Sequence, residues 1–262
     1  TASPDFPLLN AYQTTYDGGN YDAFVTKLAP AGNTLVYSTY LSGLQADYTQ
    51  GIDIDASGSA YVTGCTRSAG FPTLNAYDNT LNGVIDAFIT KLSPSGSALD
   101  YSSFLGGSSN DYGVGITVDA GGSAYVAGLT YSVNFPQLNA YQSALSGSPD
   151  AFITKFAPGG QNLVYSTYLG GSLRTVAYGI VVDKVGSVYI TGGTNSSDYP
   201  TVNAYNNTYS GGLFDAIVAK LAPGGNSLVY STFLGGTEVD FAPRLAIDTF
   251  GCAYVAGQTG SS

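Results

Sequence analysis

Histidine, methionine and tryptophan are all absent from the 262 residues of this chain, and lysine and arginine together number only 8. Without histidine, the chain cannot build Ser-His or Cys-His nucleophile systems, a histidine general base or a histidine-ligated metal site. The scarcity of basic side chains and a net charge of −10 argue against nucleic acid as a partner, because Lys and Arg bind its phosphates. No apolar run approaches the roughly 20 residues that cross a bilayer, so we expect no membrane insertion.

Glycine and tyrosine, in contrast, are abundant, with 35 and 22 residues. Together with many Ser, Thr, Asn and Val residues, they favour strands and tight turns over helices. Only 10% of the residues are charged. A weakly charged, acidic surface suits a secreted or cell-surface protein, and this is the localisation we predict.

The dominant feature is a segment of the form Phe-Pro-x-Leu-Asn-Ala-Tyr that occurs four times, at spacings of 65, 64 and 64 residues. The four occurrences begin at Phe6, Phe71, Phe135 and Tyr199. A fixed period indicates one structural unit that has been copied. We therefore predict a single domain over residues 1–262, with repeats at approximately 1–65, 66–129, 130–193 and 194–258. Because the pattern is already under way at the first residue, we expect a processed product or part of a longer protein.

Within one copy, residues 71–134, strands are predicted over 86–92, 99–105, 115–119 and 124–128, with turns between them. Both faces of the predicted strands carry bulky side chains, as expected of a sheet that is covered on both sides. Four short strands per unit, stacked on neighbouring units, describe the blade of a β-propeller.

Four motifs recur in order along the chain. They are Gly-x-Ala-Tyr-Val-x-Gly, Thr-x-Ser-x-x-Phe-Pro, Asp-Ala-Phe-Ile-Thr-Lys-Leu-x-Pro-x-Gly and Leu-Val-Tyr-Ser-Thr-Tyr-Leu-Gly-Gly. In these motifs the chain resembles the bacterial β-propeller repeat family called SBBP, over essentially its whole length. The resemblance implies an all-β propeller of four four-stranded blades, of a kind found in large secreted or surface-exposed bacterial proteins.

The chain begins with an outer hairpin, residues 22–41, and ends with an inner hairpin, residues 245–257. Pairing the two would complete a fourth blade and remove an exposed sheet edge. We therefore predict a closed ring. An open, stacked array of the same units is the alternative.

Two sets of charged residues recur in every copy and are interpreted as structural. One set opens Asp-x-x-Gly turns, in which the carboxylate accepts hydrogen bonds from the amides of its own turn: Asp55, Asp119, Asp183 and Asp248. The other set starts each outer hairpin with an aspartate and places a lysine five residues later: Asp22, Asp86, Asp150 and Asp215, with Lys27, Lys91, Lys155 and Lys220. The odd spacing puts aspartate and lysine on opposite faces of a strand, so we expect their partners on neighbouring strands or blades, in a repeated contact between blades.

Candidate ligand-binding residues lie where the copies differ. Asp47, Asp111 and Asp240 share one loop position, which Thr175 occupies in the third copy. Three carboxylates around a channel mouth could hold a cation or sugar hydroxyls, or they could cap turns. Tyr131 and Tyr209 lie in divergent loops and are candidates for contact with a ligand or a partner. No catalytic residue, metal site or cofactor is predicted.

The two cysteines, Cys65 and Cys252, are not at equivalent repeat positions. They are expected at opposite ends of strands roughly 20 Å long. A disulfide needs Cα atoms within about 7 Å, so no bridge within one molecule is predicted. A bridge between protomers is the alternative.

These observations favour a non-enzymatic extracellular structural or adhesion module, a building block of a surface or filament-forming assembly. The expected partners are other protein subunits, through self-assembly, or cell-surface glycans. A carbohydrate-binding propeller that uses the loop Asp, Tyr and Asn side chains is the main alternative. A glycosidase with paired carboxylates is a third.

Overall fold

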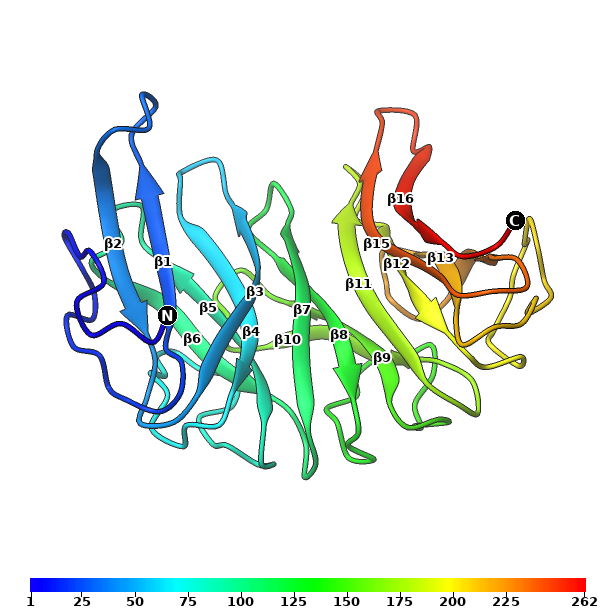
Figure 1. Ribbon diagram of the computed structural model, residues 1–262, viewed down its shortest axis with the longest axis horizontal. Coiled ribbons are helices and arrows are strands. Elements are labelled where there is room, and N and C mark those ends of the chain that lie inside the picture. The colour runs from blue at the N-terminus through cyan, green and yellow to red at the C-terminus, as the bar shows by residue number, and fades with distance from the viewer.

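The structure, a computed structural model, describes all residues from 1 to 262 and contains 16 strands (Figure 1). Their bounds are β1 Ala23–Leu28, β2 Leu35–Leu41, β3 Asp47–Ile54, β4 Ala60–Thr66, β5 Asp86–Leu92, β6 Leu99–Leu105, β7 Asp111–Val118, β8 Ala124–Thr130, β9 Asp150–Phe156, β10 Leu163–Leu169, β11 Thr175–Val182, β12 Val188–Thr194, β13 Asp215–Leu221, β14 Leu228–Leu234, β15 Asp240–Ile247 and β16 Ala253–Thr259. The structure contains no helix with the length and apolar character that a membrane crossing requires.

Twelve of the strands form three four-stranded antiparallel blades, β3–β6, β7–β10 and β11–β14, in which strands pair in chain order. The first strands of successive units, β3, β7, β11 and β15, pack against one another and form the inside of the arc (Figure 1). The all-β propeller architecture built from repeated four-stranded blades is therefore confirmed.

The remaining four strands form two separate hairpins, β1–β2 and β15–β16. The predicted pairing of these two hairpins, which would close the ring, is not made. Figure 1 shows the reason: the rotation from blade to blade leaves the first hairpin at one end of an open arc and the last hairpin at the other end. The arrangement is the open, stacked array.

In the second copy, the two outer strands have the predicted bounds, but the inner strand begins at Asp111 and not at Gly115. Its pairing with β8 shifts register between Gly113 and Gly115, which marks a β-bulge. A bulge interrupts the two-residue alternation of side chains, so the part of the strand before it reads as loop in the sequence.

The hydrophobic core lies between blades and not within them. One cluster joins Tyr125 and Ile153 of the second complete blade to Ile180, Ile190 and Ile217 of the third. Two further clusters span the preceding joints in the same way. Burial of each large apolar side chain contributes roughly 1.5–3 kcal/mol, so a blade gains most of its stability from its neighbours. This explains why both faces of the strands carry bulky side chains.

The repeated Phe-Pro-x-Leu-Asn-Ala-Tyr segment holds the long loop against its blade. In the third copy, the ring of Phe135 lies 4.5 Å from that of Phe152 and is buried. Asn139 adopts a left-handed backbone conformation, with φ of 47°, and its side-chain amide donates to the carbonyl of Val164 at 3.1 Å. Asparagine tolerates this conformation better than most residues, which accounts for its recurrence.

Candidate functional site

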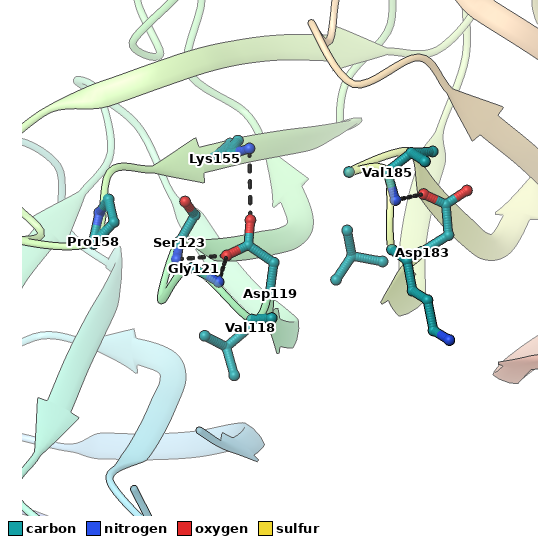
Figure 2. Close-up of a pocket in the computed structure, with 12 residues that line it drawn as sticks. Val118, Asp119, Gly121, Ser123, Lys155, Pro158, Asp183 and Val185 are labelled. Carbon is teal, nitrogen blue, oxygen red and sulfur yellow. Dashed lines mark hydrogen bonds and ion pairs between the residues drawn. The ribbon is translucent and has the colours of Figure 1, made fainter. Parts of the chain in front are cut away.

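Each Asp-x-x-Gly turn is organised by its own carboxylate (Figure 2). Oδ1 of Asp119 accepts hydrogen bonds from the amides of Gly121 and Ser123, both at 2.9 Å. Oδ2 accepts from the hydroxyl of Tyr125, also at 2.9 Å. Gly122 has φ of 82°, in the left-handed region that favours glycine. The turn therefore uses both oxygens of the carboxylate.

A lysine completes the arrangement. Nζ of Lys155 lies 3.7 Å from Oδ2 of Asp119 and 4.8 Å from the centre of the Tyr125 ring. The tyrosine and the lysine face each other on paired strands, β8 and β9. The two other complete blades repeat this Asp–Tyr–Lys triad with equivalent residues: Asp55, Tyr61 and Lys91, and Asp183, Tyr189 and Lys220.

The triad holds its aspartate ionised. Desolvation by burial raises the pKa of Asp55, but hydrogen bonds from Ser57 and Ser59 and the charge of Lys91 outweigh it and lower the pKa to about 2. Hydrogen bonding to a carboxylate and a nearby cation both favour its charged form.

The predicted contact between blades for these lysines is wrong, because the lysine pairs within its own blade. The aspartate at the start of each outer hairpin instead holds its own loop. In Asp86, Oδ2 accepts from the amide of Asn82 at 2.8 Å and Oδ1 from that of Gly83 at 3.0 Å. Lysine and aspartate lie at opposite ends of one strand, so each meets a different set of loops.

A groove of 570 Å³ lies between the turns of two neighbouring blades (Figure 2). Asp119 and Lys155 line it from one blade, and Asp183, Lys184 and Val185 from the next. Both carboxylates are engaged by their own turns, so the exposed ammonium of Lys184 is the freest charged group in the groove. The sequence reasoning missed this groove because stacking of blades creates it. Its one sequence signal is a lysine that the other three copies lack at this position.

The three candidate ligand acids are buried at the first positions of separate strands, β3, β7 and β15, and the structure does not bring them together. Asp111 is fully buried: Oδ2 accepts from the amide of Gly107 at 2.7 Å and from Oγ of Ser132 at 2.8 Å, and Oδ1 accepts from Thr130. Asp47 and Asp240 accept the equivalent two bonds at Oδ2 in their own copies. This geometry favours the turn-capping alternative.

A second buried carboxylate lies close to Asp111. Burial raises the pKa of both Asp86 and Asp111 to about 6, and their mutual repulsion adds to the shift for Asp86. Gly106 lies against both groups. A Cβ atom at this residue would be 2.6 Å from Cγ of Asp86 and 2.8 Å from Oδ2 of Asp111. Only glycine fits there without displacing a carboxylate.

The two candidate tyrosines differ in accessibility. The hydroxyl of Tyr209 donates to the carbonyl of Gly212 at 2.8 Å, and its ring packs 6.1 Å from that of Phe233. Tyr131 is 36% exposed. Tyr131 is therefore the more exposed of the two candidates. The cysteines are both free thiols, Cys65 buried in β4 and Cys252 exposed beside β16.

A comparison with curated proteins finds no match. A family model described as a beta-propeller repeat, SBBP, matches residues 36–72 and 164–200. The two matched segments are equivalent parts of the first and third copies: each runs from the last outer strand through an inner hairpin to the Phe-Pro loop. With the repeated four-stranded blades, these matches show a β-propeller repeat architecture with SBBP repeats at these two positions.

Proposed function

We propose that this chain is a non-enzymatic structural module of an extracellular or cell-surface assembly, and that it joins other protein subunits. The observation that carries the proposal is the use made of the repeated polar side chains. In the complete blades, the repeated aspartates and lysines bond to turns, loops and strands of their own units. The equivalent side chains that lack these partners lie on the two terminal hairpins, at the two ends of the stack of blades.

The arrangement of the core supports the same proposal. Because each hydrophobic cluster spans two blades, the chain forms one continuous stack whose ends present unpaired strands. Unpaired strand edges are ready templates for pairing with another chain. A stack of this kind is suited to a structural role, because the shared cores hold the blades in fixed positions relative to one another.

Sedimentation velocity across a concentration series, with electron microscopy of the same samples, tests the proposal. We expect ordered, elongated assemblies that grow with concentration. A chain that stays monomeric at every concentration would contradict the structural role. A glycan-array signal that is lost in Tyr131→Ala, together with a monomeric chain, would favour the carbohydrate-binding alternative.

A further inference from the structure

The two terminal hairpins carry complementary halves of one blade. β1 pairs only with β2, and β16 pairs only with β15. In every complete blade, the strand equivalent to β16 pairs antiparallel with the strand equivalent to β1, as β12 does with β13. Each hairpin therefore has one free edge, the edge of a strand that is paired in every complete blade. The strand missing beside β1 is of the β16 type, and the strand missing beside β16 is of the β1 type.

The Asp–Tyr–Lys triad is divided between these hairpins. Asp248 holds the turn before β16 and accepts a hydrogen bond from Tyr254 at 3.2 Å, but no lysine forms an ion pair with it. Lys27, on β1, is exposed and makes no ion pair. The lysine that Asp248 and Tyr254 lack is thus present, as Lys27, on the other hairpin. Together these three residues would form the Asp–Tyr–Lys triad that the three complete blades contain.

From this complementarity we infer that β16 of one copy pairs with β1 of a second copy, which completes a fourth blade at a joint between molecules. The inference rests on the proposed structural role and specifies its partner and register. In the complete blade β11–β14, Tyr189 is opposite Lys220 and Thr194 is opposite Asp215. The same register places Tyr254 of one copy opposite Lys27 of the next.

The apolar side chains at the free edges fit this register. Tyr254 is 61% exposed and Leu28 is 56% exposed, whereas the equivalent Tyr189 and Leu221 are fully buried. On β3, Ile52 is 60% exposed, whereas Ile116, at the same position of the next unit, is 7% exposed against the preceding blade. A docked hairpin would supply that missing blade face. Burying these side chains would favour association.

A second copy suits these edges better than the other end of the same molecule. The two hairpins lie at opposite ends of the arc and form separate two-stranded sheets (Figure 1). Pairing them within one molecule would require all the joints between blades to rotate further. Those joints are filled by close-packed side chains, which resist such a change.

Cross-linking with defined register tests the joint. In a Cys252→Ser background, one chain carries Val255→Cys and another carries Thr26→Cys; the predicted register places these residues opposite each other. Opposite residues on antiparallel strands have Cα atoms about 4.5–5.5 Å apart, within the range of a disulfide. We expect a covalent dimer when the two chains are mixed and oxidised. The matched control, Val255→Cys with Phe24→Cys, is two residues out of register and should yield far less.

Charge reversal gives a second readout. Lys27→Glu should weaken self-association about tenfold, because it places a carboxylate beside Asp248 in a partly buried site. Arg67→Glu makes the same charge change at an exposed residue that follows β4, at the opposite end of the strand from the Asp-x-x-Gly turn, and should leave association nearly unchanged.

The possible outcomes distinguish failure of the inferred β16–β1 pairing from failure of the proposed structural role. A disulfide that forms only within monomers of a chain carrying both Val255→Cys and Thr26→Cys would overturn the inference and show ring closure. Assemblies that form without the mixed disulfide, and that tolerate Lys27→Glu, would overturn the joint while leaving the structural role in place. A chain that never assembles would overturn both.

Discussion

Gly106→Ala should destabilise the protein strongly, although it adds a single methyl group. Its Cβ atom would lie 2.6 Å from Cγ of Asp86, 2.7 Å from Oδ1 of Asp86 and 2.8 Å from Oδ2 of Asp111. Carbon atoms do not approach this closely, so at least one carboxylate must move. Asp86 accepts two hydrogen bonds from loop amides, and Asp111 accepts bonds from an amide and two hydroxyls.

Hydrogen bonds to charged groups contribute about 1.5–3 kcal/mol each, and overpacking a close-packed site costs about 1–3 kcal/mol. Displacing one carboxylate from two bonds should therefore lower the free energy of unfolding by about 3 kcal/mol or more. Urea denaturation followed by circular dichroism measures this change.

Gly159→Ala is the matched control. No atom lies within 4 Å of the Cβ position at Gly159, and the residue is exposed in a turn. Its effect on the free energy of unfolding should stay within about 1 kcal/mol, with a small gain expected from reduced freedom of the unfolded chain. If Gly106→Ala and Gly159→Ala had equal effects, the close packing of Gly106 against the two carboxylates would be refuted.

Three further predictions concern pH, the triad and the joint. Because the folded pKa of Asp86 and of Asp111 is about 6, above the ordinary 3.8, each favours the folded state most below about pH 4. This contribution, about 3 kcal/mol for each group, is lost as pH rises through 6. Urea denaturation between pH 4 and 7 should show the fall, reduced in Asp111→Asn, and a flat profile would contradict it. Lys155→Met should cost about 1 kcal/mol through loss of its ion pair and ring contact, and Lys184→Met close to nothing; equal costs in thermal unfolding would argue against the triad. Arg244→Gly restores the glycine that the other three copies use where neighbouring inner strands approach closely, so it should tighten self-association in sedimentation equilibrium, and weaker association would count against the joint.

The blade was predictable from sequence because its signals are local. The turn residues Asp119 and Gly122 and the bulky strands on either side of the turn specify a hairpin without reference to the rest of the fold. The early start of β7 was missed because the bulge between Gly113 and Gly115 disrupts the pattern that reveals a strand.

The features that depend on contacts between two blades were harder to predict from the sequence. Ring closure depends on the rotation at each joint, which is set by packing across the joint and leaves no pattern within one repeat. The burial of Asp111 is decided by loops more than 20 residues away along the chain, including Ser132. Its sequence position alone therefore indicated a loop acid and could not show whether water reaches it.

The location of the core between blades also determines how this molecule would respond to a pulling force. Each repeat depends on its neighbours for burial, as in other linear repeat proteins, and the terminal hairpins have a neighbour on one side only. Tension applied along the arc would therefore detach the end hairpins first, while the inner blades kept their shared cores. Such a chain yields in steps, unit by unit, and each step leaves behind a stack of the same construction.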